Sequence, residues 1–198
     1  MKLTPPTPFC IAIDTREQHP LQFPDETSTI TATCYPGDYS VVGLRHRIAI
    51  ERKGVTLNRG VWTSDLVGTI SELLRGQSGD LDRGSLRFRW ELLAMSKIIR
   101  SGGVAFVATD RPRAWYAAHT YFGGLHPSSL FGCIRSLTAD YGVPFLFFAD
   151  AAELTNYVLG ISIELWKHSH GLAAYPRTPR GEPSAPFAKW EREIGGRF

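Results

Sequence analysis

The chain has 198 residues, of which 43% are hydrophobic and 21% are charged, and its formal net charge is +3. These values predict one globular domain with a sizeable core and exclude a disordered chain. No apolar stretch approaches the ~20 residues that span a bilayer, and the N-terminus has no apolar signal segment, so we expect neither a membrane partner nor secretion. The three cysteines show no paired spacing, which favours reduced thiols in an intracellular protein over a disulfide or zinc site.

The first part of the chain is predicted to form strands separated by turns. The strands are expected at residues 10–14, 28–34, 39–42 and 47–53, with turns at Pro24-Asp25 and Pro36-Gly37-Asp38. Ser64-Asp65 is typical of a helix N-cap and predicts a short helix over residues 66–75. A longer helix is expected over residues 85–100, where apolar residues follow a helical spacing.

Strands and helices alternate in the later part of the chain. Strands are predicted at residues 104–109 and 144–148, and helices at residues 111–118, 127–141 and 151–167. This alternation predicts an α/β fold with a partly parallel sheet that helices cover on both faces. From residue 171 the composition shifts to Pro, Arg and Gly, which predicts a flexible tail.

The sequence Glu51-Arg52-Lys53 ends an alternating apolar run, and Asp38 precedes it in a Pro-Gly-Asp turn. Because side chains alternate along a strand, Glu51 and Lys53 should project from one face and Arg52 from the other. Two carboxylates can hold a hard divalent cation, and a neighbouring lysine can position or deprotonate a water for attack on phosphorus. The pattern therefore indicates a metal-dependent nuclease, although Glu-x-Lys on a surface strand and Asp in a turn also occur for solubility and turn formation alone.

Four ordered motifs strengthen this interpretation. They are Ile-Asp-Thr-Arg-Glu at residues 13–17, Gly-Asp-Tyr at 37–39, Ile-Glu-Arg-Lys at 50–53 and Asp-Leu at 65–66. Over roughly residues 9–166 the chain resembles the nuclease domain of the XPF family of structure-specific DNA endonucleases. The resemblance implies a restriction-endonuclease-like fold with a central mixed β-sheet flanked by helices. It also implies metal-dependent hydrolysis of phosphodiester bonds in branched DNA, such as flaps, forks and junctions.

The resemblance implies roles for the residues of the first three motifs. Asp38 and Glu51 match the family's metal ligands, which suits Mg²⁺ or Mn²⁺, and the Arg52 carbonyl is a candidate further ligand. Lys53 would position the attacking water and stabilise charge on the phosphate. Glu17 would reach this metal or a second one, and Arg16 would contact the scissile phosphate or pair with a carboxylate. Asp14 has either a role in the site or a structural role as the partner of Arg52.

The family's aspartate after Glu-Arg-Lys is matched by Asp65, but eleven residues at positions 54–64 intervene where the family has only a few. We expect these residues to form an inserted loop, which a fold tolerates at modest entropic cost. Within the loop, Arg59 could contact a phosphate and Trp62 could stack on an unpaired base. The alternative is an ordinary surface loop with one packed tryptophan.

The helix at residues 85–100 supplies two more candidates for DNA binding, Arg87 and Arg89. Arg87 and Glu91 are four residues apart and could instead form a pair on the helix surface. Residues 75–113 contain eight Lys/Arg against four Asp/Glu, and the chain from residue 167 onward contains six against three. These basic segments around an acidic metal site suit a polyanionic substrate.

The resemblance also predicts the domain organisation and the partners. Residues 1–8 are interpreted as an extension, 9–170 as the nuclease domain and 171–198 as a basic tail, without the family's helix-hairpin-helix or helicase modules. A partner helicase or DNA-binding protein could replace those modules. Localisation would be cytoplasmic or nucleoid in a prokaryotic or viral setting and nuclear in a eukaryote.

A homodimer is expected because XPF-type nuclease domains commonly pair through their last helices. The contact would use apolar residues that otherwise cover the sheet, namely Phe145 to Phe148, Leu154, Tyr157, Val158, Ile161 and Leu165. Two other functions stay open. One is a non-catalytic DNA-binding or scaffold subunit, and the other is a sequence-specific or DNA-repair nuclease of the same superfamily.

Overall fold

The computed structural model describes residues 5–58, 61–76, 83–118 and 125–172. The chain divides into two compact units, Met1–Trp166 and Lys167–Phe198. The first unit contains the whole central sheet and the predicted site, and the second is described only as far as Leu172. The predicted flexibility of the tail therefore concerns residues that lie almost entirely outside the described part.

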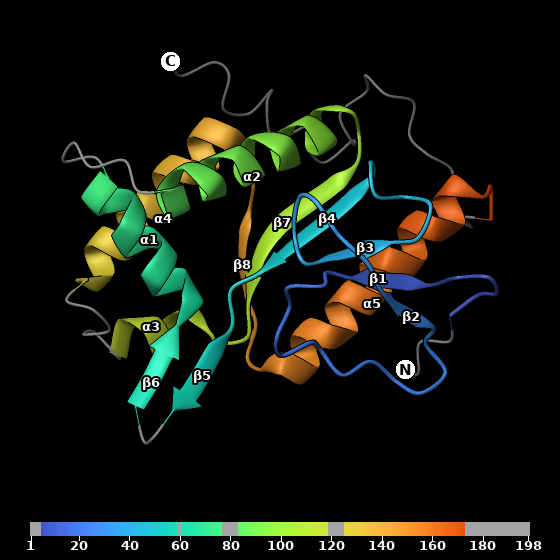
Figure 1. The fold of residues 1–198 in the computed structure, drawn as a ribbon, viewed down its shortest axis with the longest axis horizontal. Helices are drawn as coiled ribbons and strands as arrows, with labels where there is room; N and C mark the ends of the chain where they lie inside the picture. Colours follow the sequence, from blue (N-terminus) through green and yellow to red (C-terminus); the bar gives the residue numbers. More distant parts are fainter. Residues whose placement is uncertain (1–4, 59–60, 77–82, 119–124, 173–198) are drawn as a thin grey trace, which may run out of the picture. The chain divides into compact units, whose positions relative to one another are not determined.

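A six-stranded mixed sheet forms the centre of the first unit (Figure 1). Its strands, in chain order, are β1 (Ile11–Ile13), β2 (Thr29–Thr31), β3 (Tyr39–Val41), β4 (Ile48–Arg52), β7 (Val104–Thr109) and β8 (Phe145–Phe147). The spatial order is β2-β1-β3-β4-β7-β8. Strand β3 is antiparallel to both β1 and β4, whereas β4, β7 and β8 are parallel to one another. All the predicted strands are present, and the predicted mixed sheet is confirmed.

Helices cover both faces of this sheet, as predicted. They are α1 (Asp65–Gly76), α2 (Arg83–Arg100), α3 (Arg113–Ala118), α4 (Pro127–Tyr141) and α5 (Ala151–Ser169). One buried cluster joins α1, α2, α3 and α4 to the sheet, and a second joins α5 to the opposite face. Strand β4 contributes to both clusters because its side chains alternate: Ala49 faces the first, and Ile48 and Ile50 face the second.

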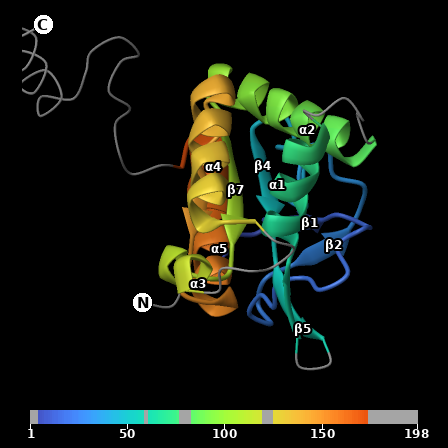
Figure 2. The ribbon, with the colours of Figure 1, turned by 90° about the vertical axis from the view of Figure 1, so that its left-hand side faces the viewer.

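The segment between Lys53 and Asp65 was expected to be a loop, and this expectation is wrong. It contains a two-stranded antiparallel sheet of β5 (Val55–Asn58) and β6 (Val61–Ser64), with Leu57 paired with Trp62. The physical reason is local: the β-branched and aromatic residues of Val-Thr-Leu-Asn and Val-Trp-Thr-Ser flank the two residues Arg-Gly, a composition that favours a hairpin. Figures 1 and 2 show β5 extending away from the central sheet, beyond the end of α1.

The apolar residues of α5 do not form the surplus surface that was expected to drive dimerisation. Leu154 and Val158 are fully buried, and Leu165 is 7% exposed, because all three pack in the cluster on this face of the sheet. Tyr157 is the exception, with 43% of its surface exposed. These residues therefore mainly cover the sheet. Among the described residues, no helix is both long and apolar enough to cross a membrane.

Candidate active site

A tight turn before β3 brings Asp38 against the end of β4. Gly37 has φ +86°, and a Cβ at this position would lie 2.8 Å from the carbonyl oxygen of Ile50, so only glycine fits here. The backbone N–H of Asp38 donates to the Ile50 carbonyl at 2.8 Å. In turn, the backbone N–H of Arg52 donates to Oδ2 of Asp38 at 2.8 Å. The Pro-Gly-Asp sequence thus fixes a carboxylate next to the Glu-Arg-Lys strand end.

Glu51 and Lys53 lie on the same face of β4, as the strand alternation predicted. Lys53 Nζ is 2.7 Å from Glu51 Oε1, and the carboxylate is buried, with 5% of its side chain exposed. The Lys53 ammonium also lies 4.8 Å from the centre of the Phe88 ring on α2, a cation–π contact. The lysine is therefore held in one position beside the carboxylate.

A cavity of about 170 Å³ adjoins this pair. Its lining residues come from the end of β4 and from α1 and α2: Lys53, Thr69, Glu72, Arg87, Phe88 and Glu91. Arg87 Nε and Glu91 Oε1 form the predicted i, i+4 pair at 3.0 Å, so Arg87 does lie beside the candidate site. Arg89 does not, because it lines a separate groove with Trp90 and Tyr141.

The folded protein disfavours the ionised forms of Asp38 and Glu51 when no metal cation is bound. Burial, followed by the charge of Glu51, raises the pKa of Asp38 to about 8. Burial also raises the pKa of Glu51, although Lys53 acts in the opposite direction. Burial alone would lower the pKa of Lys53, but the charge and hydrogen bond of Glu51 outweigh it and the pKa is raised. Two adjacent carboxylates that resist ionisation are an oxygen donor set that a divalent cation would stabilise.

Within the described ranges, no group of three or more His, Cys, Asp or Glu side chains is arranged to hold a metal ion. The predicted set of Asp38, Glu51 and Glu17 is thus not assembled as a three-residue group. The donors present are the Asp38 and Glu51 carboxylates. This pair fits Mg²⁺, which is commonly bound through one or two carboxylates while water and substrate phosphate complete its shell.

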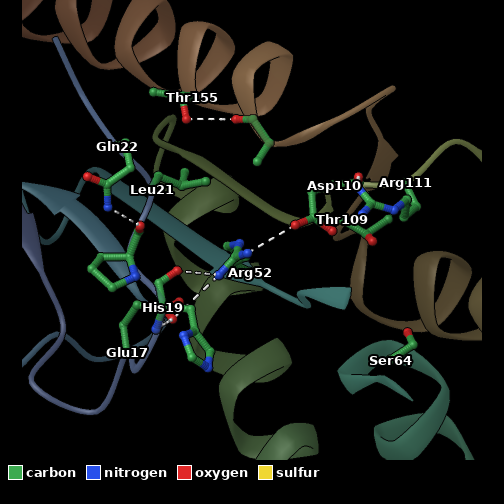
Figure 3. A network of polar contacts seen from close by, with 12 residues as sticks. Glu17, His19, Leu21, Gln22, Arg52, Ser64, Thr109, Asp110, Arg111 and Thr155 are labelled. Carbon is green, nitrogen blue, oxygen red and sulfur yellow. Dashed lines mark hydrogen bonds and ion pairs between the residues drawn. The ribbon is translucent and has the colours of Figure 1, made fainter. Parts of the chain in front are cut away.

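Arg52 projects from the other face of β4, again as predicted, and enters a separate polar network (Figure 3). Its guanidinium lies 3.0 Å from Asp110 Oδ2 and 3.5 Å from Glu17 Oε1. It also donates to the carbonyl of His19 at 2.7 Å. The carboxylate of Glu17 therefore pairs with Arg52.

The proposed pairing of Asp14 with Arg52 is wrong. Asp14 is buried and pairs instead with Arg16, whose Nε lies 2.7 Å from Oδ1. Its second oxygen accepts the backbone N–H of Cys34 at 2.6 Å. Burial tends to raise the pKa of Asp14, but these hydrogen bonds outweigh it and the pKa is lowered. The physical reason is proximity, since Arg16 is two residues away and folds back over the turn. Of the two roles expected for Arg16, a phosphate contact or a pairing with a carboxylate, the structure shows the pairing.

Asp65 returns to the neighbourhood of Lys53 despite the eleven inserted residues. The backbone N–H of Asp65 donates to the carbonyl of Gly54 at 3.1 Å, so the hairpin leaves and rejoins the fold at one place. Burial raises the pKa of Asp65, and the charge of Lys53 opposes that shift. As predicted, Ser64 caps α1, with its Oγ accepting the backbone N–H of Val67 at 3.4 Å.

Trp62 packs edge-on against Trp115, with ring centres 6.0 Å apart, and Arg111 lies over its ring at 5.4 Å. Arg59 lies outside the described residues. Asp110 was not among the predicted site residues, although a signal existed. It directly follows a buried strand that is parallel to β4, and the carboxyl ends of parallel neighbours meet at the same edge of a sheet.

The chain has a restriction-endonuclease-like α/β fold, a mixed sheet flanked by helices. Two carboxylates and a lysine lie at one end of a central strand. No family model matches the chain, and no curated protein sequence matches it significantly.

Solved structures of XPF from Aeropyrum pernix share the fold. One aligns with a TM-score of 0.51 and 17% identity over 96% of this chain and 75% of that chain. Another, described as XPF from Aeropyrum pernix in complex with DNA, aligns with a TM-score of 0.50 and 14% identity over 94% and 82% of the two chains. At these identities the similarity establishes the fold, which confirms the predicted XPF-like nuclease fold.

Proposed function

We infer that this chain is a metal-dependent DNA endonuclease of the XPF type that acts on branched DNA. The observation that carries the proposal is the adjacency of Asp38, Glu51 and Lys53 at the carboxyl end of β4. The likeness in fold to an XPF structure with DNA supports DNA as the substrate class. An intact pair of acidic residues with a lysine argues against a purely non-catalytic scaffold, which would not need them.

Asp38 and Glu51 are the residues that would hold Mg²⁺ or Mn²⁺. A bound divalent cation would supply Lewis-acid stabilisation of charge on the phosphate and lower the pKa of a bound water. Lys53 is held 2.7 Å from Glu51, where its ammonium can orient a water and stabilise negative charge on a phosphate oxygen. Arg87, 59% exposed beside the same cavity, is placed to contact a DNA phosphate.

The roles of the other predicted residues divide by their contacts. Glu17 and Arg52 belong to the network on the opposite face of the sheet, and we assign them to holding the strand end in place. Asp14 and Arg16 shape the turn behind Asp38, since the backbone N–H of Asp14 donates to the Asp38 carbonyl at 2.7 Å. Asp65 borders the site through Lys53.

We expect cleavage of phosphodiester bonds that requires Mg²⁺ or Mn²⁺ and stops on addition of EDTA. The test is a panel of labelled flap, fork, four-way, single-stranded and plain duplex DNA, resolved on denaturing gels. Preference for the branched members would support the proposal, and preference for one duplex sequence would favour a sequence-specific nuclease. Binding without cleavage of any member, with either metal, would favour the scaffold alternative.

Assembly as a homodimer, with or without a helicase or DNA-binding partner, is a further proposal. On α5, Tyr157 is the exposed apolar residue of those predicted for the contact, with its ring edge-on to Phe106. Light scattering is expected to give twice the 22.0 kDa chain mass, and Tyr157→Asp is expected to shift it toward a single chain. A monomer for the unaltered protein at micromolar concentration would refute the homodimer.

A further inference from the structure

The β5–β6 hairpin begins two residues after Lys53 and ends at the residue before Asp65. Both of its ends are therefore tied to the candidate active site. The hydrogen bond between Asp65 and the Gly54 carbonyl closes its base, and Ser64 Oγ donates to the buried Tyr116 hydroxyl at 3.4 Å. Tyr116 in turn hydrogen-bonds Thr109 at the end of β7. The base of the hairpin is thus held against the sheet.

Along one face of the hairpin, the side chains are buried at the base and become exposed farther out. Val55 and Ser64, at the base, are each 7% exposed. The next pair outward on the same face is Leu57 and Trp62, and Leu57 is 56% exposed although it is apolar. The other face carries Thr56 and Thr63, whose hydroxyls hydrogen-bond each other at 2.7 Å. Leu57 therefore faces solvent, beside a Trp62 that is partly buried against the core.

Two arginines belong to the segment of residues 111–115, which contacts Trp62 through Arg111 and Trp115. Arg111 follows β7 and Asp110 (Figure 3), and its guanidinium lies over the Trp62 ring. Arg113, at the start of α3, is exposed and lies 4.4 Å from the centre of the Phe131 ring. Among the described residues neither arginine forms an ion pair with a carboxylate, since Asp110 pairs with Arg52. Arg111 Nη1 also donates to the carbonyl of Asp110 at 2.7 Å. This hydrogen bond and the ring contacts fix the positions of the two positive charges.

Resting on the proposed function, we propose that the β5–β6 hairpin with Arg111 and Arg113 binds an unpaired DNA strand next to the scissile phosphate. Interleaved arginine and aromatic groups are the chemistry that recognises single strands: guanidinium groups contact phosphates, and apolar and aromatic faces receive unstacked bases. A duplex offers phosphates but keeps its bases stacked, so Leu57 and Trp62 would gain nothing from it. The hairpin would thereby direct cleavage to places where duplex and single strand meet.

The test compares Arg111→Ala/Arg113→Ala with a control of equal charge, Arg45→Ala/Arg100→Ala. Arg45 and Arg100 are exposed and precede β4 and β7, at the opposite ends of these strands. Fluorescence anisotropy in EDTA would measure binding to a blunt duplex and to the same duplex carrying a single-stranded oligothymidine arm. We expect Arg111→Ala/Arg113→Ala to bind the armed DNA about tenfold more weakly, because two contacts to phosphates are lost. Its salt slope should fall by about 1.4, or about 0.7 for each lost contact to a single strand.

A second pair of variants keeps the core intact. Leu57→Glu places a negative charge on the exposed hairpin face, and Ile30→Glu does the same on β2, where Ile30 is 43% exposed. We expect weaker binding of the armed DNA for Leu57→Glu and no change relative to the unaltered protein for Ile30→Glu. Equal losses in variant and control, or equal losses on blunt and armed DNA, would overturn the proposal because net charge alone would then account for them.

Cleavage by the unaltered protein in Mg²⁺ separates this inference from the proposed function. Selective loss of armed-DNA binding without any cleavage would sustain the hairpin site and refute the endonuclease. The hairpin site alone would be refuted if the unaltered protein cleaves branched DNA, and if Arg111→Ala/Arg113→Ala and Leu57→Glu change neither this cleavage nor the binding.

Discussion

Replacing Glu51 with Gln, or Asp38 with Asn, is expected to reduce DNA cleavage by at least about a thousandfold. Each change removes one of the two carboxylates that adjoin Lys53, and a metal ion supplies several kcal/mol of stabilisation to charge on a phosphate. A loss of about 4 kcal/mol corresponds to about a thousandfold in rate. Single-turnover cleavage of a labelled flap or fork measures the effect, and anisotropy should show that DNA binding is largely retained.

The same two variants are expected to retain or gain stability without metal, which distinguishes loss of a site from loss of the fold. Asp38 has a pKa of about 8 because the folded state disfavours its charge, so Asn should stabilise the metal-free protein at pH 8.5, where Asp38 is mostly ionised. The sign follows from linkage. When folding raises the pKa of a carboxyl group, the folded protein loses stability as the pH rises from the unfolded-state pKa to the folded-state pKa of that group. The pKa of Glu51 is raised as well, so Glu51→Gln should act in the same direction, even though Lys53 loses its carboxylate partner.

Thermal unfolding with and without Mn²⁺ gives an independent measure of the metal site. A ligand at ten times its Kd stabilises the folded state by about 1.4 kcal/mol, and this increase in Tm should be lost in both variants. Full activity in either variant would show that the site is misassigned. An unchanged response of Tm to Mn²⁺ would show that the metal binds elsewhere.

Local patterns in the sequence were sufficient to predict the strands and the placement of Asp38, Glu51 and Lys53. Side-chain alternation assigned Glu51 and Lys53 to one face of β4 and Arg52 to the other, and this depends only on the strand itself. The Pro-Gly-Asp sequence likewise predicted a turn, and Gly37 adopts the positive φ that such a turn requires.

The partners of Arg52 depended on contacts between distant segments. Asp110 is 58 residues away and becomes a neighbour only because β7 lies parallel to β4. The same limit applies to α5, where an apolar stripe fits either a dimer contact or the cover of a sheet until the opposing face is known. The hairpin is different, because β-branched and aromatic residues flank Arg-Gly in the sequence itself. The resemblance to the family bears on the length of this insertion and not on its local structure.

Replacing Arg52 with Met is expected to destabilise the protein by about 3–5 kcal/mol, the range for breaking a buried ion pair from one side. The Arg52 and Glu17 side chains are each 10% exposed, and that of Asp110 is 5% exposed, so both carboxylates would lose their common cation in a poorly solvated place. Arg52 has a raised pKa because the hydrogen bond and charge of Asp110 outweigh its burial, which is consistent with a strongly held pair. Thermal unfolding should show Tm lowered by roughly 10 °C for a chain of this size.

Two further variants decide whether this effect comes from the buried charges. Adding Asp110→Asn to Arg52→Met removes one stranded carboxylate and should restore part of the lost stability, which a double-mutant cycle would record as a favourable coupling. Arg45→Ala is the matched control, since Arg45 is exposed and donates to a backbone carbonyl at 3.0 Å; its Tm should change by no more than about 2 °C. Arg52 lies across the sheet from Glu51 and Lys53, so its contribution to cleavage should follow the fraction of folded protein. Loss of cleavage in Arg52→Met with an unchanged Tm would instead place Arg52 in direct contact with the substrate.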